Sequence, residues 1–292
     1  MDRETAIAHR WMRLDGIDVF YREAGPADAP VVLLPHGYPC SSFQYRDFMP
    51  ALADRWRLLA PDFPGFGYSG TPDPARFSYT FDGYADFLGR FADAFGLRRF
   101  ALYLHDYGSQ IGLRLAMADP ERVAALIIQN GDVYEDELGP KYEGLRAYWD
   151  DPTMEGRSAL TGAVSEEGFR EEFLNDVPAG LAEQISPDLW KLAWGQLGSP
   201  LRREIMVGLM EGLKDNLSWF PKYQDYLREH QPPTLIVWGP HDGYMPEGAA
   251  RAYLRDLPDA ELHLLDGGHW ALETNLAEIV ALSRDFLARS HA

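Results

Sequence analysis

The sequence predicts an α/β protein with a mainly parallel, doubly wound sheet and an inserted helical cap. Short apolar runs bounded by proline, glycine or aspartate alternate with helical patterns, and this alternation predicts parallel strands with helices on both faces. Buried-strand runs stop near residue 133 and resume only after residue 231. We therefore expect a core of residues 1–132 and 232–292 and a cap of residues 133–231.

The expected strands begin with segment 17–22, whose period of two suits a strand with one buried face. Apolar runs that suit strands buried on both faces follow at 31–34, 57–60, 100–104, 123–128 and 234–238. Apolar residues recur every three or four positions over 81–95, from 111 to a stop near Pro120, and over 276–287, which predicts helices there. The middle segment contains Trp149, Trp190, Trp194 and Trp219 and is expected to form short helices before Gln231-Pro232-Pro233 ends it.

The composition excludes several classes of function. The chain has 292 residues, of which 46% are hydrophobic and 25% charged, as in ordinary globular proteins. Its formal net charge is −18, so it lacks the basic surface with which proteins bind nucleic acids or anionic membranes. The partners expected are therefore a small organic substrate and water.

The cysteine and histidine content argues against a disulfide or a metal centre. Cys40 is the single cysteine, and the eight histidines lack metal-ligand spacing, so we expect neither a metal nor a cofactor. Residues 1–10 lack the apolar core of a signal peptide, and the longest apolar runs are far shorter than the ~20 residues of a membrane span. These features predict a soluble, cytoplasmic protein.

Asp106 stands where the predicted strand 100–104 runs directly into a helix. Such a turn lifts one side chain above the carboxyl edge of the sheet, where open α/β folds bind ligands. The alternative is a chemically inert aspartate that caps the helix. In the turn 35–39, His36-Gly37 is placed to aim backbone N–H groups at a developing oxyanion, although an ordinary strand-ending turn has the same pattern.

Three further motifs follow predicted strands. Gly65 to Gly70 matches G-x-G-x-x-G, but Thr71-Pro72-Asp73-Pro74 follows instead of a helix, which favours a structural glycine loop over a dinucleotide site. Asp242 either orients a histidine or forms a turn, and His269 is either a general base or a core residue. The order Asp106, Asp242, His269 corresponds to Ser, Asp, His in α/β-hydrolases, with aspartate in place of serine.

On these residues the sequence resembles the α/β-hydrolase superfamily, and within it the branch of epoxide hydrolases and haloalkane dehalogenases. The motifs are His-Gly-x-Pro, Asp-x-x-Gly-x-Gly-x-Ser (Asp62 to Ser69), His-Asp-x-Gly and Gly-His-Trp, and the resemblance covers nearly the whole chain. Two positions depart from the family pattern. Leu104 stands where a small residue is usual, and Tyr107 stands where a tryptophan that holds the halide in dehalogenases is common.

The resemblance implies a two-step reaction. Asp106 is the nucleophile that forms an ester with the substrate, and His269, oriented by Asp242, activates the water that cleaves this ester. The backbone N–H groups of Tyr38 and Tyr107 form the oxyanion hole. An aspartate is already ionised near neutral pH and suits displacement at a saturated carbon that carries a leaving group.

The leaving group separates the two branches of the family. An epoxide leaves as an alkoxide and needs a donor, which cap tyrosines supply in epoxide hydrolases. The insertion offers Tyr134, Tyr142, Tyr148, Tyr223 and Tyr226, of which Tyr148 fits the first family tyrosine best and Tyr223 is the second candidate. Each of the two has the alternative of a packing residue.

Because Tyr38 and Tyr107 carry no N–H side chain for a halide, epoxide hydrolysis to a diol is the favoured function. Dehalogenation of a haloalkane or haloacid is the alternative, and a non-catalytic protein that binds small molecules is the lesser one. An apolar pocket lined by His36, Trp149 and Trp270 is expected to hold the substrate.

Overall fold

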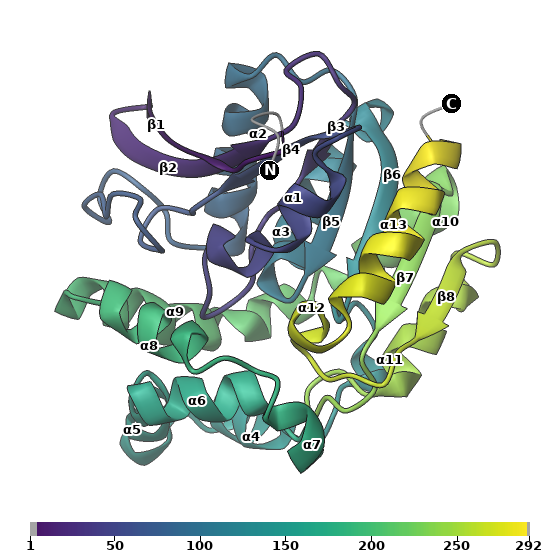
Figure 1. Ribbon diagram of the computed structural model, residues 1–292. Helices are drawn as coiled ribbons and strands as arrows, with labels where there is room; N and C mark the ends of the chain where they lie inside the picture. The colour runs from purple at the N-terminus through teal and green to yellow at the C-terminus, as the bar shows by residue number, and fades with distance from the viewer. Residues whose placement is uncertain (1–4, 291–292) are drawn as a thin grey trace.

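An eight-stranded, mostly parallel sheet forms the centre of the computed structural model, which describes residues 5–290 (Figure 1). The strand order is β1-β2-β4-β3-β5-β6-β7-β8; β2 pairs antiparallel with both β1 and β4, and the remaining pairs are parallel. The strands are β1 (Ala8–Leu14), β2 (Ile17–Ala24), β3 (Val31–Leu33), β4 (Arg57–Pro61), β5 (Phe100–His105), β6 (Val123–Gln129), β7 (Thr234–Trp238) and β8 (Glu261–Leu264). This sheet, with a helical insert between β6 and β7, confirms the predicted fold class.

The edge strand β1 has no counterpart among the predicted strands. All of its side chains are partly or fully exposed, and Trp11 is 58% exposed. The strand at the opposite edge, β8, is also only partly buried. Because an edge strand buries little surface, its sequence need not carry the apolar run by which the central strands are recognised.

Helices cover both faces of the sheet, because the side chains of β5 are buried on both of its faces. Successive side chains of a strand point to opposite faces. Ala101 and Tyr103 pack in the apolar core on one face, and Leu102 and Leu104 pack in the core on the other. The first face carries α1 (Phe48–Leu52) and α13 (Leu276–Ser290), and the second carries α2 (Phe81–Ala94) and α3 (Tyr107–Ala118).

Six helices of the insert lie over one end of the sheet, at the bottom of Figure 1. They are α4 (Tyr142–Asp150), α5 (Met154–Ala163), α6 (Glu166–Leu174), α7 (Ala179–Ala182), α8 (Asp188–Gln196) and α9 (Pro200–Leu217). The segment expected to form the cap also contains α10 (Phe220–His230), which packs against α3 beside the sheet. The shorter elements are η1 (Ser42–Tyr45), η2 (Pro120–Arg122), η3 (Glu135–Glu137), α11 (Glu247–Ala252), η4 (Tyr253–Arg255) and α12 (Ala271–Thr274).

Two glycines of α3 allow this helix to start tightly against the sheet. A Cβ atom on Gly108 would lie 2.3 Å from the carbonyl oxygen of Pro35, and one on Gly112 would lie 2.4 Å from Cδ2 of Leu104. Both distances are too short for any side chain, so the backbone approaches closely where only glycine fits. The large side chain of Leu104 therefore fits because the residue that faces it on α3, Gly112, has no side chain.

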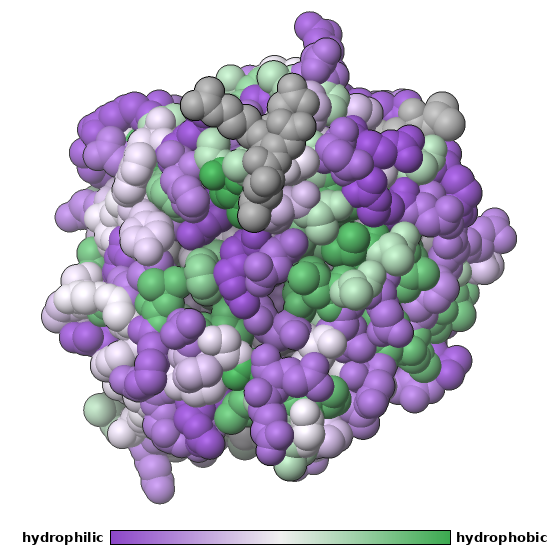
Figure 2. All heavy atoms as spheres, viewed as in Figure 1, coloured by the Kyte–Doolittle hydropathy of each residue, from purple (hydrophilic) through white to green (hydrophobic). Residues whose placement is uncertain are grey.

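Hydrophilic residues dominate the face of the molecule seen in Figure 2, and apolar residues are interspersed among them. The exposed large apolar side chains are Trp11, Tyr68 and Met154. Within residues 5–290, no helix is both long and apolar enough to cross a membrane.

Candidate active site

Asp106 lies at the sharp turn between β5 and α3. Its backbone has φ 49° and ψ −131°, a conformation that costs a non-glycine residue about 1–3 kcal/mol. Although it precedes the first residue of α3, its side chain makes no capping hydrogen bond to the helix. The carboxylate instead accepts a hydrogen bond of 2.5 Å at Oδ1 from the backbone N–H of Tyr38. The inert capping role is thus excluded, and the strained turn presents a carboxylate at the sheet edge.

His269 lies between two carboxylates. Its Nδ1 is 2.7 Å from Oδ2 of Asp242, and its Nε2 is 3.6 Å from Oδ2 of Asp106. Nε2 is buried and has no hydrogen-bond partner within residues 5–290. Since Nδ1–H donates to Asp242, Nε2 is the nitrogen that faces Asp106 and is able to accept a proton.

Asp242 is held by four donors besides His269. Its Oδ1 accepts from Nδ2 of Asn175 at 3.0 Å and from the backbone N–H groups of Tyr244 and Met245 at 2.9 and 3.1 Å. Its Oδ2 accepts from Nδ2 of Asn130 at 2.8 Å. These bonds fix the carboxylate in one orientation, and that orientation fixes the imidazole.

The charges in this group of residues favour an ionised carboxylate beside an imidazolium. Burial opposes ionisation of Asp242, but the charge of His269 and the hydrogen bonds around it lower its pKa. Burial likewise disfavours the imidazolium, yet the carboxylates of Asp242 and Asp106 raise the pKa of His269 well above its usual value. The protonation of His269 therefore depends on whether Asp106 carries its charge.

Two backbone N–H groups adjoining Asp106 are the candidate donors to an oxyanion. One is the N–H of Tyr38, which already contacts the carboxylate. The other belongs to Tyr107, which as first residue of α3 has no partner for its N–H within the helix. A Cβ atom on Gly37 would lie 2.7 Å from Cβ of Asp106, so this turn can approach the carboxylate only as glycine.

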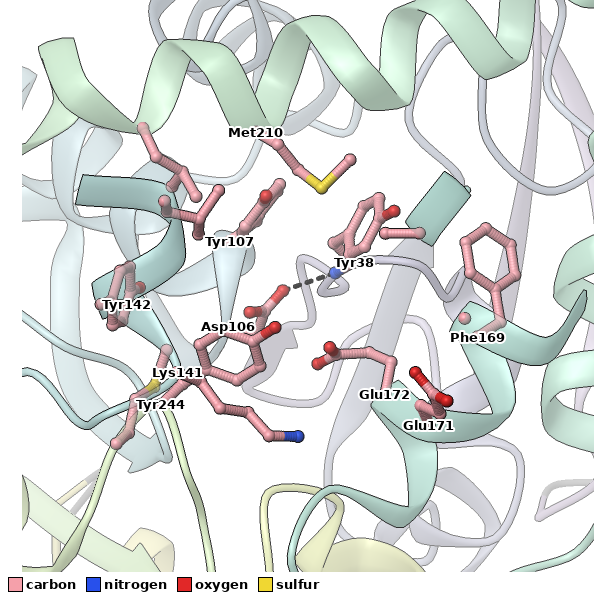
Figure 3. A pocket seen from close by; sticks show the side chains of 15 residues that line it. Tyr38, Asp106, Tyr107, Lys141, Tyr142, Phe169, Glu171, Glu172, Met210 and Tyr244 are labelled. Carbon is pink, nitrogen blue, oxygen red and sulfur yellow. Dashed lines mark hydrogen bonds between the residues drawn. The ribbon is translucent and has the colours of Figure 1, made fainter. Parts of the chain in front are cut away.

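A cavity of about 270 Å³ opens above Asp106, between the sheet and the cap (Figure 3). Its wall combines apolar side chains with phenol groups, and it includes three charged residues of the insert, Lys141, Glu171 and Glu172. The lining residues that matter below are Tyr38, Tyr107, Lys141, Tyr142, Phe169, Glu172, Met210 and Tyr244. A cavity of this size and character suits a small, largely apolar organic molecule.

The structure corrects the expectation for the two cap tyrosines. The Tyr148 hydroxyl donates to Oε1 of Glu211 at 2.7 Å, and its side chain does not line the cavity. Tyr223 is fully buried, with its hydroxyl 3.3 Å from the carbonyl oxygen of Gln110, and it also lies outside the cavity. Both hydroxyls are engaged elsewhere, so neither tyrosine is positioned to contact a substrate.

The expected pocket residues His36, Trp149 and Trp270 likewise do not line the cavity above Asp106. His36 accepts a hydrogen bond of 3.1 Å at Nε2 from the backbone N–H of Phe63. Burial lowers the pKa of His36, so it holds the loop that follows β4 as a neutral imidazole. Trp149 donates to the carbonyl of Met210 at 3.3 Å. Trp270 donates to a cap carbonyl at 3.3 Å and packs against His269, thereby joining the cap to the core.

Among the cavity residues that were not singled out from the sequence are Tyr142, Tyr244 and Glu172. Tyr142 was one of the five tyrosines of the insert, and its hydroxyl donates to Oδ2 of Asp132 at 2.7 Å. Helical spacing in the sequence could have identified Tyr142, because Tyr142, Leu145 and Trp149 lie on one face of α4 and Tyr148 lies on another. Tyr244 could have been identified because it is two residues after Asp242 in the sequence.

Comparison with known proteins agrees with this architecture. A family model described as alpha/beta hydrolase fold matches residues 30–276. An uncharacterized hydrolase of Saccharomyces cerevisiae is 33% identical over 293 residues, which cover 99% of this chain and 98% of the relative. Haloalkane dehalogenase 2 of Mycobacterium tuberculosis is 37% identical over 121 residues, 41% of either chain. The crystal structure of haloalkane dehalogenase DbeA from Bradyrhizobium elkani has a TM-score of 0.79 at 24% identity and covers 98% of this chain and 99% of that one.

Proposed function

The chain belongs to the α/β-hydrolase fold family, and on that premise we propose that it hydrolyses epoxides to diols through an ester on Asp106. The family and the similarity to haloalkane dehalogenases support a hydrolase. The observation that carries the proposal is the placement of His269 between Asp106 and Asp242, together with the hydrogen bond from the Tyr38 N–H to Asp106.

In the first step Oδ2 of Asp106 attacks a saturated carbon of the epoxide ring. A carbon–oxygen bond forms to Asp106, the ring carbon–oxygen bond breaks, and its electron pair stays on the departing oxygen as an alkoxide. In the second step His269 takes a proton from water, and the hydroxide adds to the ester carbonyl. The N–H groups of Tyr38 and Tyr107 stabilise the resulting oxyanion. As it collapses, the bond from the Asp106 carbonyl carbon to the substrate oxygen breaks, and the carboxyl proton of Asp106 passes to the departing oxygen, which releases the diol and restores the carboxylate.

The charge on Asp106 makes His269 a base at the right moment. While Asp106 is ionised, it is one of the two carboxylates that raise the pKa of His269. Formation of the ester removes this charge, so the pKa of His269 falls in the intermediate. The imidazole is then able to accept a proton from water exactly when the ester must be cleaved.

The side chains around the cavity favour an alkoxide over a halide as the leaving group. An alkoxide is a strong base that needs a proton, whereas a halide needs only hydrogen-bond donors. The cavity presents O–H groups, from the phenols Tyr38 and Tyr244 and the carboxyl Glu172. The indole N–H groups of Trp149 and Trp270 donate to backbone carbonyls instead. Dehalogenation remains the second candidate, because known haloalkane dehalogenases are similar in sequence and fold.

A paired activity screen tests the choice between the two reactions. Purified protein is incubated with small epoxides and with haloalkanes of matching carbon skeletons, and diol and halide are measured. We expect diol from at least one epoxide and little halide release, because phenol and carboxyl O–H groups line the cavity, whereas the indole N–H groups of Trp149 and Trp270 are engaged by backbone carbonyls. Halide release that outpaces diol formation would replace the proposal by dehalogenation.

Tyr148→Phe is expected to leave diol formation at the wild-type rate. The hydroxyl that this substitution removes contacts Glu211 and does not face the cavity. Single-turnover measurement of ester formation provides the check. A slower ester-forming step in Tyr148→Phe would show that the cap rearranges to bring this tyrosine to the substrate.

A further inference from the structure

Glu172 of α6 faces Asp106 across the cavity, although acidic residues rarely point into a pocket for apolar molecules (Figure 3). Its helix is tied to the core next to the catalytic histidine. The carbonyl of Glu172 accepts a hydrogen bond of 3.3 Å from Nε1 of Trp270, and the neighbouring Phe173 packs on the Trp270 ring at 4.4 Å. The carboxyl group is therefore held in the cavity by its own backbone contacts and by packing.

Tyr244 brings a phenol from the core to the same place. Its backbone N–H donates to Oδ1 of Asp242 at 2.9 Å, and its ring contacts the ring of Tyr142 at 5.5 Å. The charge of Glu172 and burial raise the pKa of Tyr244. The phenol thus stays protonated beside the carboxyl group, and both groups line the cavity in which Asp106 would react.

The surroundings of Glu172 determine when its carboxyl group holds a proton. Burial raises the pKa of Glu172 to about 7, and the negative charges of Asp106 and Asp242 act in the same direction. The positive charges of His269 and Lys141 oppose this effect. A carboxyl group with such a pKa is partly protonated at neutral pH and is able to act as an acid.

The phenols that face Glu172 do not ionise in the same pH range. They belong to Tyr38, Tyr107 and Tyr244, and the charge of Glu172 contributes to the raised pKa of each. Each phenol therefore remains neutral over the range in which Glu172 titrates. Glu172 lines the cavity from the cap beside the charged residues Lys141 and Glu171, and with its pKa of about 7 its proton is exchangeable near neutral pH.

We propose that Glu172 and Tyr244 together form the acid that protonates the departing oxygen of the substrate, an inference that rests on the proposed function. As the ring carbon–oxygen bond breaks, the alkoxide takes the phenolic proton of Tyr244, and the phenolate takes the proton of the Glu172 carboxyl group. Glu172 is left as a carboxylate. It regains a proton from solvent after His269 has taken one from water and released it, so that one epoxide and one water give one diol.

This assignment gives ester formation a defined pH dependence. Glu172 must be protonated in the first step, so the rate is highest below its pKa and falls as the pH rises through about 7. When Glu172 is ionised, it accepts the hydrogen bond of Tyr244 and turns this phenol away from the substrate. A Glu172→Gln variant lacks the titrating proton and should lose this decline.

The test follows ester formation alone, in the His269→Gln background where the ester accumulates. Intact-protein mass spectrometry measures its rate with a small aryl epoxide and with an alkyl sulfonate of the same carbon skeleton, whose leaving group needs no proton. We expect that either Glu172→Gln or Tyr244→Phe, introduced into the His269→Gln protein, slows ester formation with the epoxide relative to the sulfonate by on the order of 10²-fold. In this background the rate of ester formation should fall at a higher pH than in the wild type. The reason is that the charge of His269 lowers the pKa of Glu172, and the His269→Gln substitution removes that charge.

Glu167→Gln is the matched control, since Glu167 lies on the same helix, is exposed and pairs with Arg170. It should leave both rates unchanged. Equal losses with the epoxide and the sulfonate in Glu172→Gln would assign this residue to packing and overturn the proposal, as would an unchanged epoxide rate. Adducts from the sulfonate but none from any epoxide, in all variants, would show instead that the proposed function itself is wrong.

Discussion

Asp106→Ala is expected to abolish turnover, with a loss on the order of 10⁴-fold or more. In the proposed mechanism the residue supplies the carboxylate that attacks the substrate, and this carboxylate accepts the hydrogen bond from the backbone N–H of Tyr38. The measurement is diol formation at saturating substrate, together with mass spectrometry of the intact protein. Neither product nor adduct should appear.

The control for this variant is its fold. Alanine at φ 49° keeps the backbone strain of the turn, so thermal unfolding and far-ultraviolet circular dichroism must show a folded protein. Asp106→Asn is the matched second variant, because it retains the size of the side chain and replaces only the nucleophilic oxygen. Turnover at the wild-type rate in a folded Asp106→Ala protein would remove Asp106 from the mechanism.

His269→Gln is expected to stop the reaction after the ester on Asp106 has formed. Ester formation needs the Asp106 carboxylate and not the imidazole, whereas cleavage of the ester needs a base for water. The protein should gain the mass of one substrate molecule, and peptide mapping should place this mass on the peptide that contains Asp106. No diol should be released.

The position of His269 makes this result specific. Its Nε2 is 3.6 Å from Asp106 and its Nδ1 contacts Asp242, so loss of the imidazole removes the base that lies next to the ester. Asp242→Asn should trap the same adduct more weakly, because the imidazole remains but loses the carboxylate that orients it. An unmodified His269→Gln protein after long incubation with a proven substrate would contradict the two-step scheme.

The sequence was sufficient to predict where the core places its functional groups. Asp106, Asp242 and His269 each follow a strand, and the carboxyl ends of parallel strands meet at one edge of a sheet. The turn residues Gly37 and Tyr38 follow another strand to the same edge. Local pattern and chain order were therefore enough, because the sheet itself converts positions along the chain into proximity.

The cap residues could not be predicted in the same way. Tyr148 was favoured by its distance along the chain from Asp106, yet on α4 it lies off the face that carries Tyr142 and Trp149 and contacts Glu211. A helix has several faces, and which face meets the cavity depends on how the helix docks. Sequence spacing from the nucleophile contains no information about that docking.

The amino-acid sequence by itself determined the fold class and the edge of the sheet at which Asp106, Asp242 and His269 meet, since both follow from short-range patterns and parallel pairing. Only the tertiary structure decided which cap side chains reach that edge. Glu172 faces the cavity because non-local contacts, from Trp270 to its carbonyl and from Asn175 to Asp242, hold α6 in one orientation. Contacts between residues about 70 to 100 positions apart are set by the packed chain as a whole, and no local pattern specifies them.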